Sequence, residues 1–241
     1  MMGDQMTKFV SLHNNLHRHI RVDQSRIEAQ GAKERMVPVV MSEFLKLAVQ
    51  YPIAFTKYSD TGRFVCVALL GFEEHENLFW DGDRWQGIYT PLNIVRQPFF
   101  IGQEDEKTVI CIDAESDCLT REEGQAIFTE QGEETEFLRK IKAMLAQLIE
   151  GEQQTQIFIE ALLQHKLLMP MSFNITFVNQ QEQRVQGLYT IDEEKLSALD
   201  DEAIAQLHRQ AYLKPIYTLI ASLGHIYSLV EKKNARLAGE S

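Results

Sequence analysis

The sequence predicts an α+β fold in which antiparallel β-hairpins pack with several helices. Two pairs of β-type runs, within residues 53–72 and 172–190, are each joined by a polar turn, which is the pattern of a β-hairpin. Apolar residues recur with helical spacing from residue 136 to 168 and again from 212 to 232. Strands and helices that follow one another in this irregular order indicate an α+β protein.

The first hairpin is predicted from Ile53–Lys57 and Arg63–Phe72. The second of these runs is apolar at nearly every position, so we expect a strand that is buried on both faces. A short helix over residues 42–48 precedes the hairpin, with Ser42 as its expected N-terminal cap. Pro52 ends that helix, because the residue before a proline is displaced from helical geometry.

Residues 76–91 form the most informative stretch, because they place both tryptophans around the acidic turn Asp81-Gly82-Asp83. Large aromatic side chains bury much area, and an indole N–H needs a partner when it is buried. The stretch therefore either lines a cavity or fills the core, and the sequence leaves both open. An arginine between aromatic residues and a proline can offer a planar donor fork, although a purely structural Arg–Asp pair is the alternative. The candidate binding residues are Asn77, Asp81, Arg84, Trp85 and Arg96.

The C-terminal half is expected to be mainly helical around the hairpin at 172–190. The helix at 136–168 is either continuous through Gly151 or divided there, since glycine weakens a helix interior. An acidic connector at residues 129–135 suggests an N-terminal α+β region, 1–130, and a second region, 131–241; one single compact domain is the alternative. The last apolar stripe predicts one helix over residues 212–232.

Composition excludes some classes of partner. The chain has 241 residues and a net charge of -11, and its pI is near 5.1. Binding to nucleic acid or to an anionic membrane surface requires clustered Lys and Arg, so we expect neither. The apolar runs are too short for a transmembrane helix, and residues 1–15 lack the pattern of a secretory signal. We therefore expect a cytoplasmic protein with reduced thiols.

Motifs for catalysis, metals and cofactors are missing from the sequence. There is no P-loop, no G-x-G-x-x-G, no G-x-S-x-G, no H-E-x-x-H and no C-x-x-C. His13 and His17 would share one helix face, but a zinc site needs three or four ligands. Cys66 and Cys111 lie in apolar runs and are interpreted as buried hydrophobic residues. We expect no metal and no cofactor, and the sequence leans against an enzyme without excluding a site assembled from distant residues.

A series of short motifs runs in order through the chain. The motifs are Val67-Ala68-Leu69-Leu70-Gly71, Glu76-Asn77-Leu78-Phe79, Tyr89-x-Pro91, Arg96-x-Pro98-Phe99, Cys111-Ile112-Asp113, Gly187-Leu188-Tyr189-x-Ile191-Asp192-Glu193 and Leu199-x-Asp201-Glu202. Over residues 8–230 this ordered series resembles the bacterial SapC family. One departure is visible, because relatives often have Arg-Arg-Tyr-Pro-Phe where this chain has Val95-Arg96-Gln97-Pro98-Phe99. The family is named after a protein encoded with an S-layer export system. The resemblance supplies no catalytic residues.

These observations favour a bacterial accessory protein that binds a peptide or protein partner. An aromatic-rich, partly polar loop has the composition of an anchor surface. Two alternatives stay open. One is an enzyme with a pocket at residues 76–99 that acts on a small molecule or a peptide. The other is a structural component associated with the S-layer or with export, which the missing secretory signal disfavours.

Overall fold

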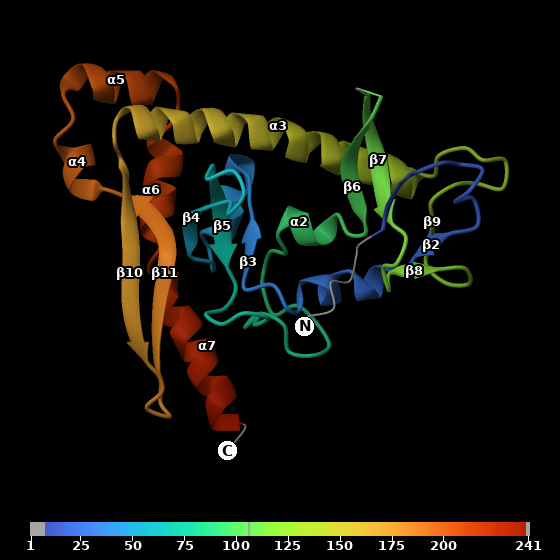
Figure 1. The fold of residues 1–241 in the computed structure, drawn as a ribbon, viewed down its shortest axis with the longest axis horizontal. Coiled ribbons are helices and arrows are strands. Elements are labelled where there is room, and N and C mark those ends of the chain that lie inside the picture. The colour runs from blue at the N-terminus through green and yellow to red at the C-terminus, as the bar shows by residue number, and fades with distance from the viewer. Residues whose placement is uncertain (1–7, 106, 240–241) are drawn as a thin grey trace. The chain divides into compact units, whose positions relative to one another are not determined.

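We describe residues 8–105 and 107–239 of the protein in a computed structural model. Antiparallel sheets combine with α-helices, which confirms the predicted α+β fold (Figure 1). The chain divides into two compact units: unit 1 comprises Met1–Gly31 and Leu92–Ile149, and unit 2 comprises Ala32–Pro91 and Glu150–Ser241. Each unit is built from two separate stretches of the chain. The proposed division into folding domains 1–130 and 131–241 stays a prediction.

Unit 1 contains two small antiparallel sheets. The first has the order β1-β7-β6, and the second has the order β8-β2-β9. The strands are β1 (Phe9–Ser11), β2 (Arg21–Val22), β6 (Phe99–Glu104), β7 (Lys107–Asp113), β8 (Leu119–Thr120) and β9 (Gln125–Ala126). Its short helical elements are η1 (Gln24–Arg26), η2 (Glu28–Gly31) and α2 (Leu92–Val95).

The core of unit 1 forms where strand residues meet the start of helix α3 (Glu136–Gln164). Leu138, Ile141 and Leu145 recur at helical spacing and are at most 4% exposed. Phe99 and Ile112 belong to the same buried cluster, and they are paired across β6 and β7. This burial explains why the apolar runs around residues 99 and 110 form strands.

His13 and His17 lie in an irregular turn and not on one face of a helix. The ring nitrogen Nδ1 of His17 accepts the backbone N–H of His13 at 2.9 Å. Burial lowers the pKa of His17, although the His13 hydrogen bond opposes this. Among the residues that the structure describes, no three His, Cys, Asp or Glu side chains are grouped to hold a metal ion.

Unit 2 is built on a five-stranded antiparallel sheet with the order β10-β11-β4-β5-β3. The strands are β3 (Met36–Pro38), β4 (Ile53–Lys57), β5 (Phe64–Leu69), β10 (Leu168–Thr176) and β11 (Glu182–Ile191). Both predicted hairpins are confirmed by the pairing of β4 with β5 and of β10 with β11. Residues 66–69 of β5 are at most 4% exposed, as the apolar run predicts.

Unit 2 also contains helical elements, of which the one at Leu213–Ser222 contacts β4 and β11 of this sheet. These elements are η3 (Met41–Glu43), α1 (Phe44–Leu47), α4 (Glu193–Ser197), α5 (Asp201–Arg209), α6 (Leu213–Ser222) and α7 (His225–Gly239). The prediction that Ser42 caps the first of them is wrong. The carboxylate of Glu43 accepts the backbone N–H of Val40 at 3.2 Å, so a buried acid at the third position of the same turn satisfies the helix start.

Helix α3 is continuous through Gly151, which resolves the two possibilities left by the sequence. A Cβ atom at Gly151 would lie 2.9 Å from the side chain of Val40, so glycine permits this close approach. The helix ends four residues earlier than predicted, because Lys166 adopts a left-handed conformation with φ of 56°. Within residues 8–105 and 107–239, no helix combines the length and apolar character needed to cross a membrane.

The predicted helix 212–232 is interrupted. Helix α6 ends at Ser222 and α7 begins at His225, with Leu223 and Gly224 between them. The interruption coincides with contacts to the sheet, since Ser222 Oγ accepts the backbone N–H of Ile53 at 3.0 Å. His225 makes a hydrogen bond of 2.9 Å with the carbonyl of Ala48. These two polar contacts hold the chain in place where the helices meet.

Candidate functional site

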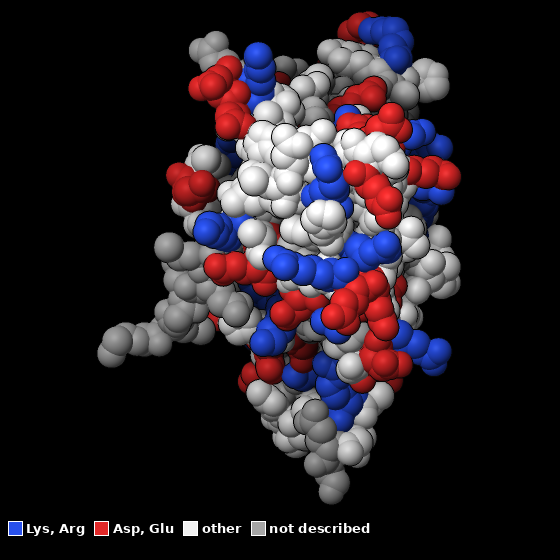
Figure 2. Space-filling view, turned by 90° about the vertical axis from the view of Figure 1, so that its right-hand side faces the viewer, with Lys and Arg blue, Asp and Glu red and all other residues white. Residues whose placement is uncertain are grey.

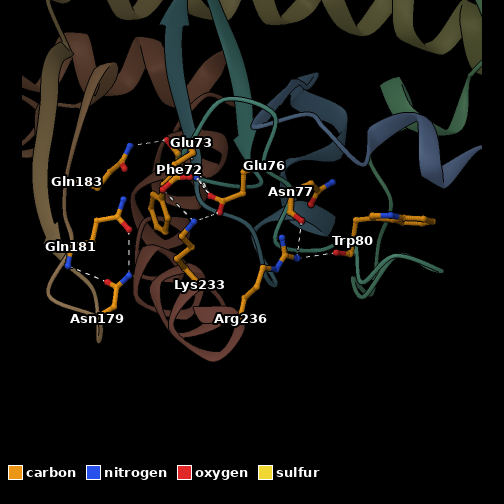
Figure 3. A network of polar contacts seen from close by, with 10 residues as sticks. All are labelled: Phe72, Glu73, Glu76, Asn77, Trp80, Asn179, Gln181, Gln183, Lys233 and Arg236. Carbon is orange, nitrogen blue, oxygen red and sulfur yellow. Dashed lines mark hydrogen bonds and ion pairs between the residues drawn. The ribbon is translucent and has the colours of Figure 1, made fainter. Parts of the chain in front are cut away.

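Residues 72–80 are fastened to helix α7 by a buried ion pair. The ammonium of Lys233 lies 2.5 Å from Glu76 Oε1 and 3.2 Å from Glu73 Oε1. The other carboxylate oxygen of Glu76 accepts the backbone N–H of Phe72 at 2.8 Å. Figure 3 shows these groups converging from the loop and from the helix. Burial acts to lower the pKa of Lys233, but the hydrogen bonds and charges of Glu76 and Glu73 outweigh it and raise the pKa.

Arg236, one turn further along α7, holds the next part of the loop. Its Nη2 donates to the carbonyls of Asn77 at 3.1 Å and of Trp80 at 2.9 Å (Figure 3). The side chain of Asn77 is 2% exposed, and its Oδ1 accepts the backbone N–H of Phe79 at 2.8 Å. Asn77 therefore shapes the loop from within, as asparagine commonly does in turns.

The turn at Asp81 is exposed and self-supporting. Asp81 Oδ1 accepts the backbone N–H groups of Asp83 and Arg84, each at 2.9 Å. These hydrogen bonds lower the pKa of Asp81. The Arg84 guanidinium lies 3.9 Å from the other Asp81 oxygen, and Gly82 supplies the positive φ of 106°. Asp81 and Arg84 thus form a solvated pair at the loop tip.

Trp85 lies in the core of unit 2, where it is 6% exposed. Its indole N–H donates to the hydroxyl of Tyr51 at 2.8 Å, and that hydroxyl donates to the carbonyl of Tyr89 at 2.6 Å. The Tyr89 hydroxyl in turn donates to Glu43 at 3.1 Å. Burial and the nearby Glu43 carboxylate raise the pKa of Tyr89. The chain of hydrogen bonds satisfies the polar atoms that the aromatic residues bring into the core.

Arg96 belongs to unit 1 and fixes the junction between α2 and β6. Its Nε donates to Asn93 Oδ1 at 2.7 Å and its Nη1 to the carbonyl of Phe99 at 2.8 Å. The guanidinium lies 4.2 Å from the ring centroid of Phe100, which is cation–π geometry. All of these partners are local to residues 93–100.

The five candidate residues therefore have different surroundings. Asp81 and Arg84 are exposed, while Asn77 and Trp85 are buried and hold the loop in place. Arg96 is part of the other unit. That any of the five binds a partner stays a prediction, and the buried pair Asn77 and Trp85 could contact one only if the loop rearranged.

A groove of about 590 Å³ opens beside strand β10, with the α6–α7 junction and α7 as its other wall. Its apolar lining residues are Phe173, Ile175, Leu223, Ile226, Tyr227 and Val230. β10 is the terminal strand of the sheet, and beyond β11 it pairs with no strand in the described part of the chain. Peptide groups that point outward from an edge strand can hydrogen-bond to an added strand. Figure 1 shows the β10–β11 hairpin alongside α6 and α7.

Sequence reasoning missed this groove. The apolar stripe of residues 212–232 predicted one helix and no groove, and Tyr227, which lies outside that stripe, is 79% exposed. Only the break at Leu223-Gly224 turns the second half of the stripe toward β10. The dipeptide Leu-Gly inside a helical pattern was the one signal available, because glycine is common just beyond a helix end.

Charged side chains do not gather into a field of one sign on the face shown in Figure 2. There, Lys and Arg are interspersed with Asp and Glu around uncharged residues. A mixed surface on a protein of net charge -11 offers no continuous basic track for phosphates. The expectation that nucleic acid is not a partner stays a prediction that agrees with this face.

The chain is thus an α+β protein in which buried polar contacts hold residues 72–80 to α7. An apolar groove lies beside the edge strand β10. Comparison with known protein families matches residues 12–229, nearly the whole chain, to SapC. The chain belongs to the SapC family. Neither the curated proteins nor the solved structures that were searched contain a match.

Proposed function

We propose that this SapC-family protein is an accessory protein that binds an extended segment of a partner protein along β10. The observation that carries the proposal is the apolar groove beside the unpaired edge of that strand. An extended segment can add its backbone to a free sheet edge, and alternate side chains then enter pockets beside the edge. Recognition would combine main-chain hydrogen bonds with burial of apolar side chains.

The chemistry of the groove favours an apolar and extended occupant. No lining residue of the groove carries a charge. The β10–β11 pairing shifts register between Met171 and Phe173, just before the groove residues. Strand irregularities of this kind redirect side chains next to functional surfaces. The far end is closed where the backbone N–H of Val178 donates to Asn234 Oδ1 of α7 at 3.1 Å. These boundaries suit about four residues of an added strand.

The enzyme alternative ranks second in this proposal. The groove beside β10 and the second cavity of unit 2, described below, are lined by residues outside 76–99, and the tip of that loop is the exposed pair Asp81 and Arg84. An active site requires convergent polar groups in a concave pocket. Cytoplasmic placement and association with S-layer export stay proposals, the first supported by the free thiols of Cys66, Cys111 and Cys118.

Selection from a displayed peptide library tests the binding proposal. Wild-type protein serves as bait, and Tyr227→Lys serves for counter-selection because it places a charge in the groove at a 79% exposed position. Tyr217→Lys is the matched control, since Tyr217 is 57% exposed and lies outside the groove. We expect apolar peptides that bind wild type and the control equally, and that bind Tyr227→Lys about tenfold more weakly.

Two results would contradict the proposal. The first is a set of selected peptides whose affinity is the same for Tyr227→Lys and Tyr217→Lys. The second is a wild-type protein that forms a stable dimer in light scattering and becomes monomeric only in Tyr227→Lys. That second result would assign the groove to another copy of this chain.

A further inference from the structure

A second cavity, of about 390 Å³, opens at the five-stranded sheet of unit 2 and is lined by residues of β3, β4, β5 and β11 and by residues directly before β3 and after β5. Strands β11 and β4 share one paired position, Tyr189 with Phe55. The hydroxyl of Thr56 spans the opening by donating to the carbonyl of Gly187 at 3.0 Å. A volume at the low end of the range for ligand pockets suits a small molecule better than a folded partner.

The charge of this cavity contrasts with that of the whole protein. Its lining includes Arg35, Lys57 and Arg184 and no carboxylate, whereas the chain carries 35 acidic and 24 basic residues. Among the described residues, none of these three cations forms an ion pair with an acidic side chain. The neighbouring carboxylate of Glu73 is outside the lining and is paired with Lys233. The positive charge of the cavity is therefore uncompensated.

The three cations come from three different elements. Arg35 directly precedes β3, and its carbonyl accepts the backbone N–H groups of Leu70 and Gly71 at 2.8 Å and 3.0 Å. Lys57 ends β4, and its ammonium lies 4.7 Å from the centroid of Phe64 and 5.2 Å from that of Tyr189. These contacts anchor the backbone of one cation and the side chain of another before any ligand binds.

Arg184 completes the set from β11, where it is paired with Asn174 of β10. Its guanidinium faces the side-chain amide of Gln186, a neutral group that leaves the positive charge in place. A guanidinium can hold two oxygens of one anion side by side, and an ammonium adds a point charge. The arrangement therefore suits a ligand with several anionic oxygens.

We propose that this cavity binds a small polyanion, either a dicarboxylate or a phosphate-bearing molecule, through Arg35, Lys57 and Arg184. The site is separate from the groove beside β10 and does not depend on the proposed partner segment. Three cations that line one cavity favour an anionic ligand, because opposite charges attract and the lining contributes no carboxylate.

Isothermal titration calorimetry of the full chain tests this site. The probes are sodium phosphate and sodium succinate, with sodium chloride at matched ionic strength as the reference. The variants are Arg35→Gln, Arg184→Gln and their combination, and Arg63→Gln is the matched control because Arg63 is exposed and outside the cavity. Circular dichroism shows which variants keep the fold, and Lys57→Met replaces any variant that does not.

We expect one probe to bind saturably with a stoichiometry near one. Each single variant should bind it at least about tenfold more weakly, and the control should match wild type, because a charged hydrogen-bond pair is lost only in the cavity. Tighter binding of phosphate or of succinate tells which ligand class the site takes. The proposal is overturned if neither probe saturates, or if folded cavity variants bind like Arg63→Gln.

Discussion

The ammonium of Lys233 lies 2.5 Å from the carboxylate of Glu76, and the two side chains are 8% and 9% exposed. This pair joins a residue near the end of the chain to the start of the aromatic loop. Because a buried charge without its partner is strongly unfavourable, the pair ties the position of residues 72–80 to the presence of α7.

Removal of one partner should therefore be costly. We expect Lys233→Met to lower the free energy of unfolding by about 3 kcal/mol, since it leaves Glu76 buried and uncompensated. Urea denaturation measures this. Lys140→Met is the control, because Lys140 pairs with Glu136 at 2.9 Å on an exposed helix face, where solvent weakens an ion pair. Equal losses of unfolding free energy in the two variants would show that the Lys233–Glu76 pair contributes no more than an exposed pair.

The same pair predicts a pH dependence at alkaline pH. The folded protein raises the pKa of Lys233 above its ordinary value of 10.5, so the stabilisation is complete below that value. It is lost as the pH rises through the higher pKa of the folded state. We expect the difference in unfolding free energy between wild type and Lys233→Met to shrink from pH 9 to pH 12. A constant difference over that range would contradict the proposed charge state.

The hydrogen bond between Trp85 and Tyr51 should stabilise the loop. Tyr51→Phe removes the hydroxyl that accepts the indole N–H and donates to the carbonyl of Tyr89. We expect a loss of about 1–3 kcal/mol, because buried polar groups then lack partners. Tyr227→Phe, at an exposed position, should change stability by less than about 0.5 kcal/mol. Thermal unfolding followed by tryptophan fluorescence compares the two variants. A Tyr51→Phe variant as stable as wild type would refute a stabilising role for the hydrogen bonds of the Tyr51 hydroxyl.

Gly71 is required by close approach of the backbone. A Cβ atom at this position would overlap the carbonyl oxygen of Glu76, which is backbone and cannot rotate away. We expect Gly71→Ala to destabilise the protein by about 1–3 kcal/mol. Gly239→Ala meets nothing within 4 Å and should be neutral or slightly stabilising. Chemical denaturation measures the stability of both variants. Equal stability of the two would contradict the close approach of Gly71 to the Glu76 carbonyl.

Local patterns along the sequence were sufficient for the hairpins and for α3. Alternating or continuous apolar runs predicted β4, β5, β10 and β11, because burial of one or both strand faces constrains each position. Position within the sheet was not predictable. That β10 lies at the edge depends on β11 pairing with β4, more than 120 residues away along the chain, and such pairings leave no local pattern.

The candidate site was predictable only in part. The composition of residues 76–91 drew attention to this segment, but it could not show that Glu76 and Asn77 meet Lys233 and Arg236 of α7. Lys233 and Arg236 follow the predicted helix 212–232, where the sequence has no apolar stripe to indicate a contact. Likewise, Arg35, Lys57 and Arg184 are far apart in the sequence and converge only when the sheet forms.

Amide hydrogen exchange of β10 tests the central proposal most directly. A peptide selected on the wild-type protein is added at saturation, and exchange is followed by mass spectrometry with Tyr227→Lys as the reference. The account predicts slower exchange within residues 172–176 of the wild type, because an added strand hydrogen-bonds the outward peptide groups of the edge. Unchanged exchange in β10, with protection confined to the loop tip at residues 81–84, would contradict it.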